Sequence, residues 1–153
     1  MEIGPMALHE WPWLLARSVA TGWEQLIPAQ RAATTPALFA ARVEHMLRLA
    51  LGLPGGTALV ARERGEPIGY TVVAVAPDEL TGMPCGHLVD IWVEPGRRGK
   101  GIGHRLTAAG EAHCRALGLP LVRRVVAAHN RTSLAHALAD GCQVERLTLV
   151  KVL

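Results

Sequence analysis

Hydrophobic residues recur along the chain at two different spacings, and the change of spacing divides it into two parts. Residues 7–33 have the spacing of helices, with a break at Pro28. Thr35 followed by Pro36 predicts the N-cap and first turn of another helix, which stops at Gly52. After residue 57 the spacing becomes that of strands, with helical stretches between them. The pattern therefore predicts helices first and a sheet afterwards.

Two β-rich runs, 57–64 and 67–76, are joined by Arg64-Gly65-Glu66-Pro67 and predict a hairpin. The expected elements after it are a strand at 87–94, a helix whose apolar stripe runs from Ile102 to Leu117 and which ends at Gly118, a strand at 121–128, a helix at 130–140 and a last strand at 144–153. The near-continuous apolar run at 121–128 predicts burial on both faces of its strand. We therefore expect a mixed α/β sheet flanked by helices, with a right-handed parallel crossover.

The length and composition set the class of protein. A chain of 153 residues, half of them hydrophobic, fits one globular domain over residues 1–153. Its cysteines, Cys85, Cys114 and Cys142, have neither a metal-site nor a disulfide spacing, so we expect no metal and a reducing cytoplasm. We see no targeting segment and no apolar run of membrane length, which predicts no membrane association.

Charge is divided unevenly along the chain. Residues 1–96 hold six basic and ten acidic residues, a net charge of −4, whereas residues 97–153 hold ten basic and three acidic residues, a net charge of +7. A solvated basic surface explains this split, and so does an anion bound by the second half with a cationic partner for the first. A nucleic-acid interface is a further reading, but aromatic residues do not interleave the basic ones, so we expect no nucleic-acid partner.

A glycine-rich loop with basic residues follows the strand at 87–94 and precedes a helix. Glycines allow positive φ and close approach of a ligand to the backbone, and successive N–H groups at a helix N-terminus attract anions. Arg97, Arg98 and Lys100 add positive charge. The loop therefore predicts a phosphate site. The spacing fits neither a P-loop nor a dinucleotide fingerprint, since the glycines read GxGxG and no acid lies at 119–127.

The stretch Val93-Glu94-Pro95-Gly96-Arg97-Arg98-Gly99-Lys100-Gly101-Ile102-Gly103 closely resembles the signature of the GNAT superfamily of N-acetyltransferases. Arg98, Gly101 and Gly103 fill its Arg/Gln, Gly and Gly/Ala positions, after a valine that ends a bulged strand in that family. Asn130 and Gly141, around a short helix, resemble a second family stretch. The resemblance covers residues 57–153 and implies a mixed central sheet with a splayed parallel strand pair.

The resemblance also implies a cofactor and the residues that hold it. Acetyl-CoA is the expected acyl donor. Backbone groups of Ile91, Trp92 and Val93 would pair with its pantetheine arm, and Asn130 would hydrogen bond to the same arm. The pyrophosphate would lie against the backbone of the glycine loop, at Arg98, Gly99, Lys100, Gly101, Ile102, Gly103 and His104. The family's reaction is direct attack of a neutral amine on the acetyl thioester, with the Val93 N–H as expected oxyanion donor.

Asp90 is the candidate catalytic base, or an acid that holds a substrate cation, because it is the lone carboxylate in the apolar part of its strand. Family members often carry this acid one position earlier, where the chain has Val89. An aspartate satisfied by backbone groups at a β-bulge is the structural alternative. His87 could act through water instead.

One position departs from the family. Many members place a tyrosine seven residues after the asparagine to protonate the thiolate, and this chain has Ala137 there. Water could protonate a thiolate, so the departure leaves turnover open. The expected function is acetyl transfer to a primary amine of a small molecule or protein. The alternative is a catalytically silent CoA-binding sensor or interaction module. Dimers are common in the family, so a homodimer is also an expectation.

Overall fold

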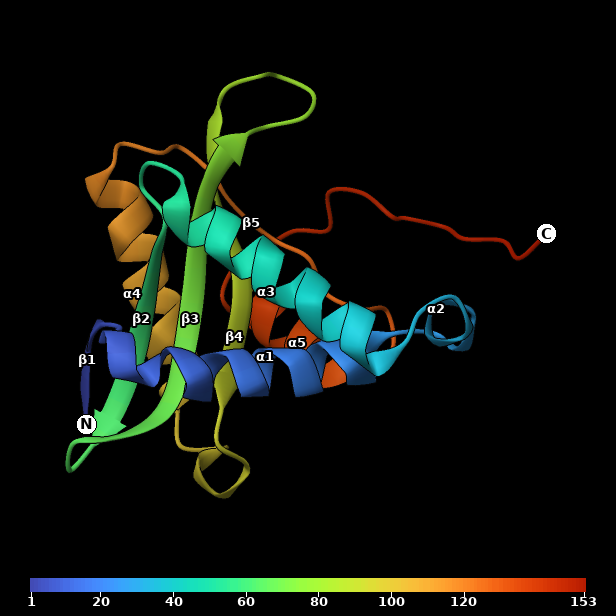
Figure 1. The fold of residues 1–153 in the computed structure, drawn as a ribbon. Helices are drawn as coiled ribbons and strands as arrows, with labels where there is room; N and C mark the ends of the chain where they lie inside the picture. Colours follow the sequence, from blue (N-terminus) through green and yellow to red (C-terminus); the bar gives the residue numbers. More distant parts are fainter.

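The computed structural model describes residues 1–153, and five strands form one mixed sheet in the order β1-β2-β3-β4-β5 (Figure 1). Neighbouring strands are antiparallel except β4 and β5, which are parallel. The strands are β1 (Glu2–Pro5), β2 (Thr57–Glu63), β3 (Glu66–Pro77), β4 (Pro84–Val93) and β5 (Val122–Arg124). The helices are α1 (Trp11–Gln25), α2 (Pro28–Ala32), α3 (Pro36–Gly52), α4 (Ile102–Ala116) and α5 (Arg131–Ala139), with 3₁₀ turns η1 (Leu8–Glu10) and η2 (Pro95–Arg97). The predicted α/β class is confirmed.

Helices cover both faces of the sheet, as Figure 1 shows. On one face, Leu14 of α1 and Leu47 of α3 pack on alternate residues of β2 and β3 such as Val60 and Val72. On the other face, residues of α4 such as Leu106 pack on a separate set of buried side chains from the same strands. Strand alternation therefore divides the core into two layers, and the central strands are buried on both sides.

Local signals account for the elements that the sequence predicted best. The Thr35 hydroxyl accepts a hydrogen bond from the Leu38 N–H, and Pro36 opens the helix, as expected for an N-cap followed by proline. At the hairpin between β2 and β3, Arg64 has φ 53° and Gly65 has φ 85°. Positive φ at both central residues is the backbone of the tight turns that join antiparallel strands. Both predictions are confirmed.

The strand predicted at 121–128 is shorter than expected. Only Val122–Arg124 is paired, and Val125 is 90% exposed. The apolar run therefore does not mark a strand buried on both faces, because residues 125–127 leave the sheet and line a cavity instead. Conversely, the pattern missed β1, where Gly4 and Pro5 weaken the signal of a strand of four residues.

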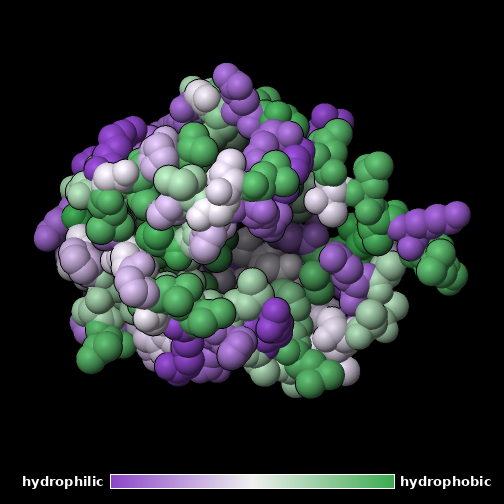
Figure 2. Space-filling view, turned by 90° about the horizontal axis from the view of Figure 1, so that it is seen from above, coloured by the Kyte–Doolittle hydropathy of each residue, from purple (hydrophilic) through white to green (hydrophobic).

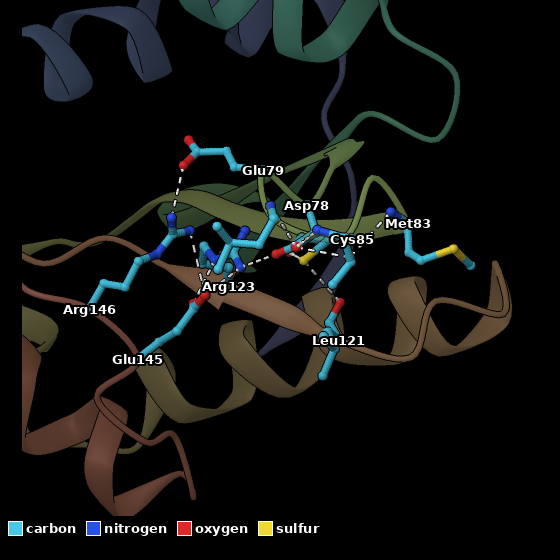
Figure 3. Close-up of polar contacts among 11 residues, drawn as sticks. Asp78, Glu79, Met83, Cys85, Leu121, Arg123, Glu145 and Arg146 are labelled. Atoms are coloured by element: carbon cyan, nitrogen blue, oxygen red, sulfur yellow. Dashed lines mark hydrogen bonds and ion pairs between the residues drawn. The ribbon is translucent and has the colours of Figure 1, made fainter.

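The strand predicted at 144–153 is wrong: no residue there pairs with the sheet, and the segment runs away from the body in Figure 1. Side-chain ion pairs attach the start of this segment to the body of the protein. Glu145 accepts from Arg123 at 2.8 Å, and Arg146 donates to Glu79 at 3.1 Å (Figure 3). Beyond that point Leu147 and Leu149 are exposed. An apolar pattern gives a strand only where a neighbouring edge accepts its backbone hydrogen bonds.

None of the helices combines the length and the apolar composition that crossing a membrane requires.

The turn between α3 and β2 gives a stability prediction. A Cβ added at Gly56 would lie 2.0 Å from the Ala50 carbonyl oxygen, whereas one added at Gly52 meets no atom within 4 Å. We expect Gly56→Ala to lower the free energy of unfolding by ~1–3 kcal/mol, because the backbone must move to make room for the added methyl group. Gly52→Ala, the matched control, should leave it unchanged or raise it by up to ~1 kcal/mol. Urea denaturation measures both, and equal stabilities would contradict the packing described.

Candidate functional site

A β-bulge in β4 sets the geometry of the site. Val72 of β3 is opposite Asp90 and Val73 is opposite Leu88, so Val89 has no partner on β3. The extra residue changes which side of the sheet the next side chains face. Leu88 packs against Cys114 of α4, whereas Asp90 hydrogen bonds to Tyr70 in the layer under α1 and α3. Without the bulge, alternation would place the Asp90 carboxylate on the α4 side with Leu88.

The parallel pairing with β5 ends at the same point. Its register runs from Gly86–Val122 to Leu88–Arg124, so β4 has no neighbour on that side beyond Leu88. The Glu94 N–H donates to the Ile68 carbonyl at 2.9 Å. By the alternation of antiparallel pairing, the backbone groups of Val93 and Ile91 then face away from β3, toward the open edge. Those of Trp92 face β3, so the open edge is formed by two of the three residues predicted.

One backbone group at this open edge is already used by a protein group. The Arg98 side chain donates from Nε to the Val93 carbonyl at 3.0 Å. The Val93 N–H and the Ile91 carbonyl remain directed at the gap. A donor and an acceptor along one strand edge can pair with an extended, amide-bearing ligand as a second strand would.

A cavity of ≈ 450 Å³ opens where β4 and β5 separate. One wall comes from Leu88–Ile91 of β4, from Arg124–Ala127 and from Asn130, and the other comes from α1, α2 and α3. The space-filling view shows the molecule hollowed, with hydrophilic and hydrophobic residues both reaching the rim (Figure 2). The cavity is therefore shared by the open strand edge and by the helices of the N-terminal part.

Asp90 lies on this cavity with its carboxylate held by a protein donor. The Tyr70 hydroxyl donates to Asp90 Oδ2 at 2.9 Å, and Ser18 of α1 lines the same cavity. Burial raises the pKa of Asp90 above its ordinary value, although the nearby polar groups of Ser18, Tyr70 and the Ile91 backbone oppose the rise. A carboxyl group with a raised pKa accepts a proton more readily near neutral pH.

Aromatic rings surround Tyr70, the hydrogen-bond partner of Asp90. Tyr70 stacks on Trp92 at 6.1 Å between ring centroids and meets Trp13 edge-on at 5.7 Å. The Arg17 guanidinium lies 5.2 Å from the centroid of Trp13 and 5.6 Å from that of Trp92. Burial and the nearby carboxylate of Asp90 raise the pKa of Tyr70, so this hydroxyl stays a donor.

The glycine loop lies exposed at the other end of β4. Gly99 and Gly101 have φ of 76° and 75°, and a side chain at either position would meet only open space. The N–H groups of residues 99–104 donate to no protein acceptor. They lie at the start of α4, a helix of 15 residues, where the helix dipole adds positive potential. The loop thus presents a row of free donors with Arg98 and Lys100 exposed beside them.

The last two predicted binding residues are in contact with protein groups. His104 Nδ1 lies 2.6 Å from Asp140 Oδ1, and Arg124 donates to the other carboxylate oxygen at 3.0 Å. Asn130 caps α5 by accepting from the Ser133 N–H at 3.1 Å, and its amide donates to Gln25 of α1 at 3.3 Å. Both residues therefore lie where β5 leaves the sheet, and Asn130 also lines the cavity.

The structure also shows where His87, the alternative to Asp90 as catalytic base, and Ala137, the position of the family's tyrosine, lie. His87 is not among the residues that line the cavity, its buried Nε2 has no hydrogen-bond partner, and burial lowers its pKa. Ala137 is buried. No group of three or more His, Cys, Asp or Glu side chains is arranged to hold a metal ion.

Sequence reasoning missed the contribution of Ser18 and Tyr70. Tyr70 is the chain's lone tyrosine, and the hairpin register places it opposite Trp92, one pair away from Asp90. The hairpin register could therefore have placed Tyr70 near Asp90 from the sequence alone. No sequence feature could have placed Ser18 there, because its position next to Asp90 depends on how α1 packs across the sheet.

Comparisons with known proteins give a family match and a shared fold. The family model described as the acetyltransferase (GNAT) family matches residues 23–139. The mycothiol acetyltransferase of Thermomonospora curvata is 37% identical over 81 residues, which are 53% of this chain. The chain spans only 25% of the length of that relative.

Solved structures share the fold at low sequence identity. A putative acetyl transferase from Pyrococcus furiosus aligns over 99% of this chain and 100% of its own, with a TM-score of 0.80 and 17% identity. A ribosomal-protein-alanine N-acetyltransferase from Brucella melitensis aligns over 100% of both chains, with a TM-score of 0.68 and 18% identity. An aminoglycoside N-acetyltransferase in complex with CoA aligns over 99% of both, again with a TM-score of 0.68 and 18% identity.

The raised pKa of Asp90 has a consequence for stability. A carboxyl group whose pKa is higher in the folded state contributes stability that is complete below the ordinary aspartate pKa and is lost as pH rises through the raised value. We therefore expect Asp90→Asn to be more stable than the parent protein at pH 7, with a difference that shrinks toward acid pH.

Asp78→Asn is the matched control with the opposite sign. Hydrogen bonds from Arg123 and Thr81 lower the pKa of Asp78, so its replacement should destabilise the protein at neutral pH, again with a difference that shrinks in acid. Urea denaturation at several pH values measures both variants. A loss of stability for Asp90→Asn at pH 7 would contradict the burial of its carboxylate.

Proposed function

Because the chain belongs to the GNAT acetyltransferase family, we propose that it transfers an acetyl group from acetyl-CoA to a primary amine of a small molecule or protein, by direct attack in a ternary complex. One observation carries the proposal: the N–H groups of residues 99–104 have no protein acceptor and lie at the start of α4, and Gly99, Lys100 and Gly101 are exposed. Unpaired donors at a helix N-terminus suit a diphosphate.

The chain's residues fit CoA along a continuous path. The backbone from Arg98 to His104 would hold the pyrophosphate, with Arg98 and Lys100 adding positive charge. The Val93 N–H and the Ile91 carbonyl would pair with the amides of the pantetheine arm, and Asn130, which also lines the cavity, would contact the same arm. When bound, acetyl-CoA supplies the activated acetyl thioester.

The proposed roles of Asp90 and Val93 follow from their places at this gap. The amine nitrogen forms the new C–N bond, the C–S bond breaks, and one amine proton passes to Asp90 directly or through water. The Val93 N–H is the candidate donor to the oxyanion that develops on the acetyl carbonyl. Solvent would protonate the departing thiolate, because Ala137 offers no hydroxyl.

A CoA-binding module without catalysis is the second candidate. Two observations favour it: the Asp90 carboxylate already accepts a hydrogen bond from Tyr70, and Ala137 stands where a proton donor is common in the family. Tight binding of acetyl-CoA without release of CoA thiol on any amine would favour this function over acetyl transfer.

Binding of CoA should depend on the glycine loop. Gly101 has φ 75°, so Gly101→Val strains the backbone of the loop that presents the free N–H groups. We expect at least a tenfold rise in the Kd for CoA, measured by calorimetry on folded protein. Gly96→Val is the control, because Gly96 has ordinary φ and open space around it. Equal affinity for CoA in both variants would remove the proposed cradle.

Turnover should depend on Asp90. Removing a general base typically lowers the rate ~10²–10⁴-fold. We expect Asp90→Asn to show such a loss in release of CoA thiol with any amine that the parent protein accepts, and CoA affinity to be unchanged. The parent's rate should rise with pH as Asp90 ionises, and the variant should lack this rise. A variant with the parent's rate and pH profile would end the assignment of Asp90 as the base.

A further inference from the structure

The cavity beside Asp90 contains little charge. Among the residues that line it, only Asp90 and Arg124 are charged. The Arg124 guanidinium donates to Asp140 at 3.0 Å and is therefore neutralised by a carboxylate outside the lining. Asp90 is left as the single group of the cavity that can balance a cation.

The acidic residues of the first half of the chain do not add to this charge. Several of them are paired with arginines away from the cavity: Glu10 with Arg62, Glu44 with Arg48, Glu63 with Arg97 and Asp78 with Arg123. The acidic composition of residues 1–96 therefore does not produce an acidic pocket. These acidic residues instead form ion pairs with arginines elsewhere in the structure.

The helical wall of the cavity has a polar part and an apolar part. Thr21, Gln25 and Gln30 contribute uncharged hydroxyl and amide groups, whereas Val43 and Met46 of α3 contribute apolar surface. The Gln25 amide oxygen is used by Asn130 and that of Gln30 by the Ile27 N–H, which leaves both NH₂ groups as donors. Such a wall suits a ligand with hydroxyl or carbonyl groups on one side and hydrocarbon on the other.

We propose that the acceptor of this site is a compact primary amine with a single positive charge, carried on an uncharged body with hydroxyl or amide groups. The inference rests on the proposed function in naming the ligand an acceptor. The amine lies at Asp90 and the body lies along Thr21, Gln25 and Gln30. The cavity of ≈ 450 Å³ also receives the thioester end of the donor, which keeps the acceptor small.

A second cation on the acceptor would be disfavoured. The second cation would lose its hydration on entering the cavity, whose wall offers hydrogen-bond donors and hydrocarbon but no second carboxylate. A buried charge without a partner is costly. Polyamines and multiply charged amino sugars should therefore be poor acceptors, although amines in general remain attracted to Asp90.

A matched pair of amines tests the proposal. 5-Amino-1-pentanol and 1,5-diaminopentane have the same length, and they differ in a hydroxyl against a second ammonium group. We expect kcat/KM for the amino alcohol to be at least tenfold higher, measured by CoA-thiol release. Calorimetry with both amines, in the presence and absence of CoA, measures their binding independently of turnover.

A charge placed on the wall supplies the converse test. Gln30→Glu keeps the oxygen that caps α2 and adds a carboxylate to the cavity, so it should raise kcat/KM for the diamine relative to the amino alcohol by at least fivefold. Gln143→Glu adds the same charge on the exposed C-terminal segment and should leave the ratio unchanged.

The outcomes separate the acceptor class from the reaction. Preference for the amino alcohol in binding and turnover supports both. Equal or better use of the diamine overturns the acceptor class while acetyl transfer stands. Preferential binding of the amino alcohol without acetylation of either amine supports the ligand class and contradicts acetyl transfer. Binding of neither amine, or an equal response of Gln30→Glu and Gln143→Glu, overturns the inference.

Discussion

The loss of strand pairing beyond Leu88 is the constraint on which the rest of the site depends. β5 pairs with β4 over three residues, and the bulge at Val89 comes directly after them. The bulge turns Asp90 toward α1 and α3, and the end of pairing leaves the Val93 N–H and the Ile91 carbonyl without a neighbouring strand. Two neighbouring irregularities therefore act together: the end of pairing opens the strand edge, and the bulge places a carboxylate beside it.

Opposite charges are kept at the two ends of this edge. At the end of β4, free N–H groups, a helix N-terminus and basic side chains create positive potential. At the bulge, a single carboxylate lies among apolar and uncharged polar groups, where burial raises its pKa. The positive end suits a ligand's diphosphate, and the carboxylate suits an amine that reacts at the ligand's other end. This arrangement supports acetyl transfer more directly than the net charge of either half does.

The glycine loop and the helix after it could be predicted from the sequence because their signal is local. Glycines with positive φ and basic residues lie together at 97–101, directly before α4, and the structure exposes residues 98–101 of this loop. The acceptor side was not predictable in the same way. Ser18 reaches Asp90 through the packing of α1, and the uncharged wall follows from which acidic residues find arginine partners. Those are contacts between residues far apart in the chain.

The strand predictions failed for a related reason. Residues 121–128 and 144–153 both have strand-like composition, yet only Val122–Arg124 is paired. Composition indicates that a segment could join a sheet, but pairing requires an available edge in register. At Val125 the chain leaves that edge, and this departure forms the cavity.

The central claim is that the free amides of residues 99–104 and the Val93 N–H bind one extended ligand. Titration of ¹⁵N-labelled protein with CoA, followed by amide chemical shifts, tests it most directly. The account predicts that both sets of amides shift with the same Kd, while those of the loop at 78–83 do not. Shifts confined to other parts of the chain, or unchanged amides at 99–104 under saturating CoA, would contradict it.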